Sequence, residues 1–405
     1  MRDFIPRVPV LIIGGPWILT LSTVRSLGRK RIPLFATGTD GSFVSYSRWH
    51  RAAPAEWGDR PTPTTLSAFL AKLPVDRMVV IPCSDEWALA MAQVDPIVAA
   101  RFPASLASAE SLDALIDKGR FARLLDRLDL PHPRTVLFEN EGDWADLRTD
   151  AFVNAFLKPH HSQAFRRGYG AKGLHFETPS EAIALALDAR RRGLDVMLQE
   201  YIPGPPTCHY MVEGFVDRIG RPIARFVRQR LRMYPPDFGD STYMVSVPLD
   251  RVRGAIESLD RLFAHLSYRG VFEAEFKYDD RDGQFKLLEV NTRPWYFIGF
   301  AAECGVDLCE MAYWDALGVS VDPVTTYKEG RYCVVGGDRF ACRELFRQGR
   351  LSAWSWLWEW LGARQLLFSW SDPLPGFARI LQHLRVVIGR RLAGIRGAVE
   401  AGTTR

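Results

Sequence analysis

Residues 270–295, GVFEAEFKYDDRDGQFKLLEVNTRPW, contain the most informative pattern in the chain. Two segments in which polar and apolar residues alternate, 271–278 and 284–290, flank the Asp- and Gly-rich run 279–283. Alternation with a period of two is typical of half-buried strands, and Asp-Gly sequences favour tight reversals. The pattern therefore predicts an antiparallel hairpin.

One face of this predicted hairpin is rich in oxygen ligands. Glu289 and Asn291 point to the same side of their strand, and antiparallel pairing brings Glu273 or Glu275 of the first strand beside them. Facing carboxylates repel without a cation between them, and Glu and Asn oxygens suit magnesium that bridges nucleotide phosphates. Arg293 would add a fixed charge for a phosphate or carboxylate. The alternative is an ordinary hairpin with one solvated polar face.

Length and composition predict an ordinary globular protein. The 405 residues suffice for two or three packed units, and a net charge of +5 gives no indication of nucleic-acid binding. No signal peptide and no bilayer-spanning apolar segment is apparent, so we expect a cytoplasmic protein. The cysteines lack CxxC pairs or zinc spacing and are expected to be reduced thiols; they are Cys83, Cys208, Cys304, Cys309, Cys333 and Cys342.

The N-terminal part predicts a strand, helix, strand unit of the doubly wound kind. The apolar run 8–13 ends in Gly14-Gly15, a helical pattern follows, and residues 32–37 form the next strand. The glycine pair is not a GxGxxG motif; it indicates either a nucleotide site or a turn that lets helix pack on strand. After the buried strand 78–81, Ser84-Asp85 either begin a helix or contribute to a substrate site.

Three lysines in the middle of the chain are candidates for binding phosphate. Lys118 lies within the helical pattern 108–128, where a merely exposed lysine is the alternative. Lys158 ends a predicted strand, and a polar glycine-containing loop, residues 160–172, leads to Lys172. A mobile loop between two lysines can fold over a triphosphate, although glycine and arginine also mark plain exposed loops.

Two further strand ends suggest binding surfaces. The strand 196–202 leaves into Pro-Gly, so its edge can hydrogen-bond a purine between the apolar walls of Tyr201 and Ile202; the alternative is a strand that simply ends at a turn. The strand 222–232 carries three arginines on one face, which is a candidate anion site: Arg228, Arg230 and Arg232.

The tail beyond residue 322 has a different character. Five tryptophans, at 354, 356, 358, 360 and 370, precede a basic amphipathic pattern over residues 377–399. Such a helix can lie on a membrane surface. Packing of the tryptophans on the body of the protein is the preferred interpretation.

The ordered motifs resemble the ATP-grasp superfamily, and specifically its carboxylate-amine ligase-like branch. The resemblance covers about residues 8–317 and depends on the order of weak motifs: Asp117-Lys118, Lys158-Pro159, Lys172, Gln199-Glu200-Tyr201-Ile202-Pro203-Gly204, Glu275-Phe276 and Glu289-Val290-Asn291-Thr292-Arg293-Pro294.

The resemblance implies a mixed α/β and α+β fold in four parts. An N-terminal Rossmann-like pre-ATP-grasp domain (1–105) would precede the two ATP-grasp subdomains, one with a phosphate loop (106–200) and one with a metal site (201–321). A helical, basic, Trp-rich extension (322–405) would follow.

The resemblance also assigns roles to residues. It implies nucleotide binding by Lys118, Lys158, Lys172, Glu200, Tyr201 and Ile202, and Mg²⁺ or Mn²⁺ binding by Glu275, Glu289 and Asn291. Glu273 competes with Glu275 for the first metal position, and Glu275 is preferred because the Glu-Phe pair matches the family strand. Arg293 and Arg232 would steady the transferred phosphoryl group or the carboxylate.

The implied activity is that of an ATP- and Mg²⁺-dependent ligase. It would form an acyl phosphate from a small carboxylate, with amino acids among the candidates, and transfer the acyl group to an amine. The alternatives are an ATP-grasp carboxylase or kinase, or a non-catalytic nucleotide-binding protein that contacts a membrane through its C-terminal helix. The identity of both substrates and any homo-oligomer stay open at this level.

Overall fold

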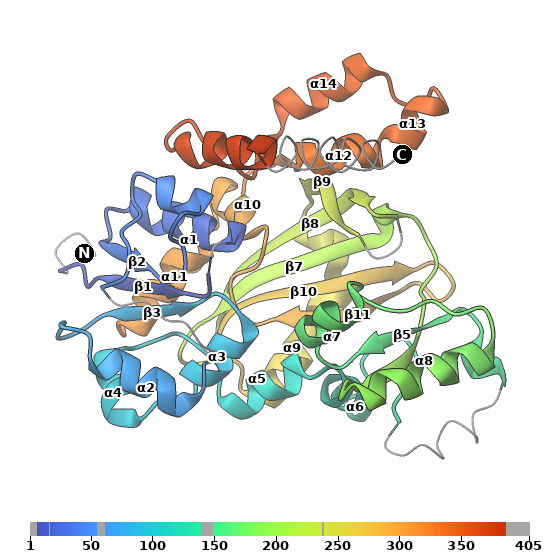
Figure 1. Cartoon of the computed structure of the whole chain (residues 1–405), viewed down its shortest axis with the longest axis horizontal. Coiled ribbons are helices and arrows are strands. Elements are labelled where there is room, and N and C mark those ends of the chain that lie inside the picture. Colours follow the sequence, from blue (N-terminus) through green and yellow to red (C-terminus); the bar gives the residue numbers. More distant parts are fainter. Residues whose placement is uncertain (1–5, 16, 55–60, 139–148, 237–238, 386–405) are drawn as a thin grey trace, which may run out of the picture.

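A computed structural model describes residues 6–15, 17–54, 61–138, 149–236 and 239–385. Within these ranges the strands form three sheets, and the largest of them runs through the middle of the molecule in Figure 1.

The N-terminal sheet is parallel, and its helices cover both faces. Its order is β2-β1-β3, from β1 (Val10–Ile13), β2 (Leu34–Ala36) and β3 (Val79–Pro82). All four residues of β1 are buried, as a strand covered on both sides requires. The expected strand, helix, strand unit is confirmed. The helices here are α1 (Ile18–Arg29), α2 (Pro63–Ala71), α3 (Asp85–Met91) and α4 (Pro96–Arg101).

Gly14 and Ser84 both have local structural explanations. Gly14 has φ +142°, and a Cβ at this position would lie 2.9 Å from the Cβ of Cys83, so the turn lets β1 and β3 approach each other. The Ser84 side chain accepts a hydrogen bond from the backbone N–H of Trp87 at 3.3 Å and caps α3. Packing and capping therefore account for both positions.

The second sheet is small and antiparallel. Its order is β4-β6-β5, from β4 (Thr135–Val136), β5 (Ala155–Pro159) and β6 (Val196–Glu200). The single helix expected over 108–128 is divided at Asp117, which has ψ 111° and caps the next helix through Arg120 N–H. The helices of this part are α5 (Ala109–Ile116), α6 (Lys118–Arg127) and α8 (Pro179–Arg191).

The expected loop over 160–172 is largely helical. Helix α7 spans Ser162–Tyr169, so the prediction of an irregular loop is wrong for most of this segment. Phe165, which is fully buried, stacks on Tyr169 one turn later with ring centroids 4.6 Å apart. The contact between these two rings stabilises the helix, although the glycines and arginines of the segment are typical of a loop.

The third sheet contains the predicted hairpin. Its first five strands have the order β11-β10-β7-β8-β9 and are antiparallel: β7 (His209–Val216), β8 (Pro222–Tyr234), β9 (Asp240–Ser246), β10 (Gly270–Asp279) and β11 (Gln284–Asn291). Helix α9 (Arg253–Leu266) covers the apolar face, where Leu262 and Phe263 cluster with Phe272 and Phe276. The alternate residues of β10 therefore point to the opposite face.

The chain then returns to the N-terminal part and to the far edge of the third sheet. Residues 297–317 form two helices, α10 (Ile298–Glu303) and α11 (Leu308–Ala316), which are separated at Gly305 (φ +103°) and both contact α1. The C-terminal extension is not purely helical, because β12 (Arg331–Cys333) and β13 (Arg364–Gln365) continue the sheet beyond β9. Its helices are α12 (Val335–Ala341), α13 (Arg343–Arg347), α14 (Ala353–Gly362) and a helix over residues 374–385.

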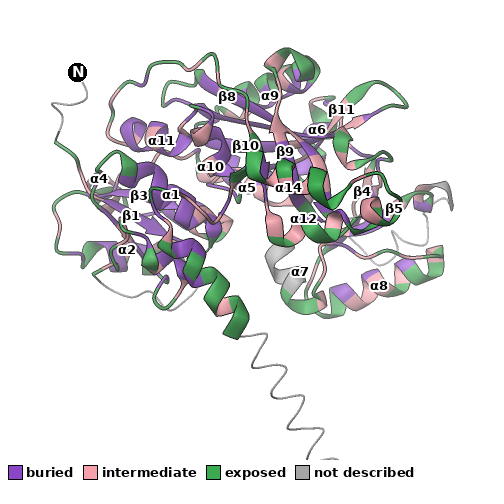
Figure 2. Ribbon diagram, turned by 90° about the horizontal axis from the view of Figure 1, so that it is seen from above, coloured by how far each residue is buried: buried purple, intermediate pink, exposed green. Residues whose placement is uncertain are grey.

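These C-terminal helices form the top layer in Figure 1, and Figure 2 looks down on them. The part of the tail pattern beyond residue 385 lies outside the described residues. No helix in the described ranges is long and apolar enough to cross a membrane. Short 3-10 helices are η2 (Phe43–Tyr46), η4 (Thr149–Phe152), η5 (Pro206–Cys208) and η6 (Leu249–Val252).

A buried ion pair ties the extension to the N-terminal part. Arg25 Nε lies 3.0 Å from Asp372 Oδ2, and the two side chains are 8% and 1% exposed. The guanidinium also donates to the carbonyl oxygens of Leu367 and Asp372, at 2.9 and 2.8 Å. Asp372 Oδ1 accepts from the backbone N–H of Arg48 at 2.9 Å. Both charges are thus almost fully saturated with partners.

Replacing Asp372 by Ala is expected to lower the free energy of unfolding by about 3 kcal/mol, because it leaves the Arg25 guanidinium buried without its counter-ion. Urea unfolding followed by fluorescence measures this. Glu303→Ala is the control: it removes a carboxylate that pairs with Arg29 and Arg364 near the surface, and it should cost less than about 1 kcal/mol because both arginines reach solvent. Equal losses in the two variants would show that the Asp372 pair does not hold the extension.

Candidate functional site

The polar face of the β10–β11 hairpin gathers the predicted metal ligands. In the register of the two strands Glu273 lies opposite Asn291, and Glu275 lies opposite Glu289. These four side chains share the face turned away from α9, as the alternation in the sequence predicts. On the other side of β10, Glu213 of β7 lies beside Glu273.

A buried arginine compensates the two neighbouring glutamates. Arg228 of β8 forms ion pairs with both Glu213 and Glu273 and is 1% exposed. Its guanidinium also lies over the ring of Phe297, 4.8 Å from the centroid. Burial raises the pKa of Glu213 to about 8, against the opposing effect of the Arg228 charge.

Glu273 in turn orients the amide of Asn291. Asn291 Nδ2 donates to Glu273 Oε2 at 2.8 Å, which turns the amide oxygen of Asn291 to the other side. Glu273 is therefore engaged by Arg228 and Asn291 together.

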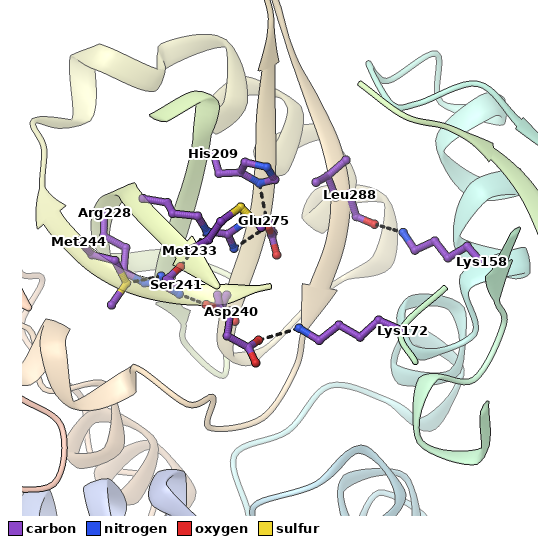
Figure 3. A network of polar contacts seen from close by, with 12 residues as sticks. Lys158, Lys172, His209, Arg228, Met233, Asp240, Ser241, Met244, Glu275 and Leu288 are labelled. Carbon is purple, nitrogen blue, oxygen red and sulfur yellow. Dashed lines mark hydrogen bonds and ion pairs between the residues drawn. The ribbon is translucent and has the colours of Figure 1, made fainter. Parts of the chain in front are cut away.

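Glu275 has a different set of partners, shown in Figure 3. Its Oε1 accepts hydrogen bonds from His209 Nδ1 and Arg230 Nη2, both at 2.9 Å. Burial opposes the charged form, but Arg230 and His209 hold the pKa of Glu275 well below its usual range. Arg230 is itself fixed by Ser241, whose hydroxyl accepts from Nε at 2.8 Å.

Glu289 faces a lysine of the second sheet's helices. Lys118, the first residue of α6, places Nζ 3.6 Å from Glu289 Oε2. The Glu289 side chain is 36% exposed, the Lys118 side chain 14%. Lys118 is therefore not an ordinary exposed lysine: its side chain is mostly covered and points at the acidic hairpin.

Lys158 connects the second and third sheets from β5. Its Nζ donates to Gln199 Oε1 at 2.8 Å. It also donates to the carbonyl oxygen of Leu288 on β11 at 3.4 Å (Figure 3). Burial, reinforced by the charge of Lys118, lowers the pKa of Lys158 to about 8. Lys118, Lys158, Gln199 and Leu288 line a small cavity between the two sheets.

Lys172 makes a second connection between these parts. Its Nζ lies 2.6 Å from Asp240 Oδ1 at the start of β9, and the two side chains are 37% and 70% exposed (Figure 3). Because both groups reach solvent, the pair contributes little to stability and is easily exchanged.

The three predicted adenine-binding residues lie at the end of β6. Glu200 Oε1 accepts from Arg281 Nη2 at 2.7 Å, and its Oε2 accepts from the backbone N–H of Arg134 at 3.2 Å. Lys277 Nζ lies over the ring of Tyr201, 4.8 Å from its centroid, and Ile202 is buried.

The two predicted catalytic arginines lie in different surroundings. Arg293 Nε lies 3.0 Å from Asp85 Oδ1, so it joins the hairpin to the carboxyl end of β3. Arg232 instead makes two hydrogen bonds with Asp338, at 2.9 and 2.8 Å, and one with Glu359 at 2.8 Å. Arg232 is thus held by the C-terminal extension and not by the hairpin carboxylates.

Two residues of this site escaped the sequence analysis. Glu213 and His209 come from β7, and only the pairing of β7 with β10 brings them beside Glu273 and Glu275. The pairing partner of a strand is not encoded in the strand's own residues, so no local signal could have placed these two side chains beside the hairpin.

The metal ligands expected here do not form an all-protein cage. Within the described ranges no three His, Cys, Asp or Glu side chains converge as a metal site. Glu275, Glu289 and the Asn291 oxygen nevertheless form a hard oxygen donor set, which fits Mg²⁺ when nucleotide phosphates and water supply further oxygens.

No family model matches the chain. It is 21% identical over 268 residues to D-aspartate ligase of Enterococcus faecium, a match that covers 62% of the chain and 61% of that protein. It is 25% identical over 193 residues to D-alanine–D-alanine ligase B of Pseudomonas putida, covering 47% and 57%. The chain therefore spans less than two thirds of the length of these curated relatives.

Solved structures share the fold over most of the chain. Biotin carboxylase from Campylobacter jejuni superposes with a TM-score of 0.62 at 14% identity, covering 80% of the chain and 75% of that protein. An ADP complex of N5-carboxyaminoimidazole ribonucleotide synthetase gives 0.62 at 13%, covering 82% of both. L-amino acid ligase from Bacillus licheniformis gives 0.55 at 12%, covering 77% and 75%. With these neighbours and two ligase relatives, the chain belongs to the ATP-grasp superfamily.

Proposed function

We propose that the protein is an ATP- and Mg²⁺-dependent carboxylate-amine ligase. The observation that carries this proposal is the juxtaposition of Lys118 and Lys158 with the oxygen-rich face of the hairpin. Lys118 of α6 and Lys158 of β5 lie on one side of a gap, and the hairpin carboxylates lie on the other. This arrangement can hold a triphosphate, because the lysines attract the phosphates directly and the carboxylates bind them through a divalent cation.

In this proposal the lysines bind phosphate oxygens, and the end of β6 binds adenine. Lys158 and Lys172 reach across to β11 and β9, so a triphosphate placed between the sheets replaces the partners they now have. Glu200, Tyr201 and Ile202 provide a polar edge and apolar walls for the purine.

Mg²⁺ would be held by Glu275, Glu289 and Asn291, and it would supply neutralisation of the phosphate charge. The contacts favour Glu273 as the residue that orients Asn291, which agrees with the preference for Glu275 as a ligand. Glu289 is the more exposed of the two carboxylates and faces Lys118 across the gap between the sheets.

The reaction follows from what these groups can position. A carboxylate oxygen of the substrate attacks the γ-phosphorus of ATP, and ADP leaves. The amine nitrogen then attacks the carbonyl carbon of the acyl phosphate, and phosphate leaves. Arg293, fixed by Asp85 between the hairpin and the N-terminal sheet, is the first candidate to bind the carboxylate. Arg232 would act only after exchanging its contacts with Asp338.

The amine acceptor is favoured over bicarbonate by the names of the two sequence relatives, both ligases of amino acids. The solved neighbours include carboxylases and share the fold alone.

The reaction class is tested by ADP release from the purified full-length chain with ATP, Mg²⁺ and a panel of amino acids and small carboxylates. We expect turnover that requires a carboxylate and an amine together, with the amide product detected by mass spectrometry. Stimulation by bicarbonate or by a hydroxyl acceptor, in place of an amine, would assign the chain to the carboxylases or kinases instead.

Glu289→Gln should lower Mg²⁺-dependent ATP turnover by at least about 100-fold, because it removes a charge that faces the triphosphate and its cation. The matched control is Glu257→Gln, an exposed position of α9 on the opposite face of the sheet, and it should keep full activity. Turnover in Glu289→Gln equal to that of the control would remove Glu289 from the metal site. Unfolding curves of both variants establish that the fold is intact.

ATP affinity should fall as the pH rises through about 8. The folded-state pKa of Lys158 is lowered to about 8 by burial and by Lys118, so the lysine is charged below this pH and loses its proton above it. The negative charges of Glu289 and Glu275 raise the pKa of Lys158, but by less than burial and Lys118 lower it. A bound triphosphate favours the charged form, so the Kd for ATP should be constant below about pH 8 and increase above it.

Lys158→Arg provides the check on this pH dependence, because a guanidinium stays charged throughout the range. Titration of ATP binding at fixed free Mg²⁺ should show the rise in Kd for the native chain and a flat profile for Lys158→Arg. The same rise in both proteins would assign the titration to another group.

A further inference from the structure

The outer side of the C-terminal extension has no part in the proposed ligase site. Ten of the seventeen large hydrophobic side chains that are exposed in the described residues lie between Phe340 and Leu384. They are concentrated on α14 and on the helix over 374–385, both in the top layer of Figure 1. Exposed apolar side chains are normally scattered singly, and a concentration of them marks an interaction surface.

The helix over 374–385 turns its apolar side away from the protein. Towards the body lie Ala378, which is 8% exposed, and Gln382, whose Nε2 donates to the carbonyl oxygen of Gly41 at 3.0 Å. The outward side chains are 47 to 56% exposed and all large: Phe377, Ile380, Leu381 and Leu384. Figure 2 shows most of this helix as exposed. A helix that packs on a hydrophobic core turns its apolar side chains towards the protein instead.

Helix α14 divides its tryptophans between two sides. Trp356 donates to Asp338 Oδ2 at 2.8 Å and stacks with Trp360, so the expected packing on the body is confirmed for these two. Trp354 and Trp358 pack only edge to face on each other and are 66% and 58% exposed, and there the expectation is wrong. Trp370 is 90% exposed.

Positive charge accompanies this apolar surface. Residues 339–405 contain eleven arginines and no lysine against four acidic residues, whereas the whole chain has a net charge of +5. Arg379 and Arg385 lie on the same helix as the exposed leucines. Beyond residue 385 the sequence continues to mix apolar residues with arginines, VVIGRRLAGIR. Tryptophan, leucine and arginine together are typical of helices that lie in the interface of an anionic membrane.

We propose that this surface docks on an anionic lipid bilayer and lies in its interfacial region without crossing it. We define the lipid face by its exposed side chains: Trp354, Trp358, Leu361, Trp370, Phe377, Ile380, Leu381 and Leu384. A second copy of the chain is the less favoured occupant, because a two-fold contact would bring arginine-rich surfaces together, whereas anionic headgroups neutralise them. The proposal does not depend on the ligase reaction.

Vesicle co-sedimentation of the full-length chain tests the lipid face. We expect binding to phosphatidylcholine vesicles that contain phosphatidylglycerol and much weaker binding to phosphatidylcholine alone. Added salt should weaken the binding, because it screens the attraction of arginines to headgroups. No binding to the anionic vesicles would overturn the proposal.

The triple variant Ile380→Gln, Leu381→Gln, Leu384→Gln should lower the partition coefficient on anionic vesicles by at least about tenfold, because less apolar surface enters the interface. The control is Ile97→Gln, Ile219→Gln, two exposed isoleucines at 80% and 67% outside the lipid face. Trp370→Ser is a second variant, chosen because the Trp370 side chain is almost fully exposed. It should reduce vesicle binding less than the triple variant does.

Equal partitioning of the triple variant and the control would overturn the proposal. Sedimentation velocity without lipid tests whether the lipid face instead binds a second copy of the chain. The second copy would be the occupant if the native chain is a dimer, the triple variant is a monomer, and vesicle binding is unchanged. Matching unfolding midpoints of the variants and the native chain show that a loss of binding does not come from unfolding.

Discussion

The polar face of the third sheet depends on the charge of Arg228. Glu213 and Glu273 are neighbours on β7 and β10, both are buried, and two such carboxylates would repel each other and lose their hydration. The guanidinium between them offsets part of both costs, although burial still raises the pKa of both glutamates, and Phe297 covers it. Glu273 can then accept a hydrogen bond from Asn291 and set the direction of its amide oxygen. Asn291, at the end of β11, is therefore oriented by a residue of β8, three positions away in the strand order of the sheet.

The lysines on the other side of the gap are held with unequal strength. Lys172 and Asp240 are both substantially exposed, so little free energy is lost when a phosphate takes the place of the aspartate. Lys158 is half-buried, its pKa is lowered, and its partners are the neutral Gln199 side chain and a carbonyl oxygen. A partly desolvated cation with neutral partners gains more from an incoming anion than an exposed cation that already has a counter-ion. In the proposed site Lys158 therefore contributes more to the affinity for the triphosphate. Lys172 exchanges Asp240 for a phosphate with little change in free energy.

The sequence allowed the hairpin, its polar face and the order of the motifs to be predicted because all of them depend on local alternation and spacing. Glu275 and Glu289 are opposite each other as that pattern requires. What escaped prediction depends on contacts between distant segments. Glu213 and His209 reach the site through the pairing of β7 with β10, and a strand's neighbour cannot be read from its own residues. In α7 the buried Phe165–Tyr169 pair outweighs the glycines and arginines that favoured a loop.

Strand β8 explains why three arginines with even spacing have three different surroundings. Arg228 and Arg230 lie over β7 and β10 and pair with glutamates of the polar face. The pairing of β8 with β9 shifts on both sides of Arg232, which interrupts the regular register at this residue. Arg232 then meets Asp338, a carboxylate with no exposed area that also accepts from Thr242 and from Trp356. One strand thus supplies two cations to the candidate site and a third to the extension.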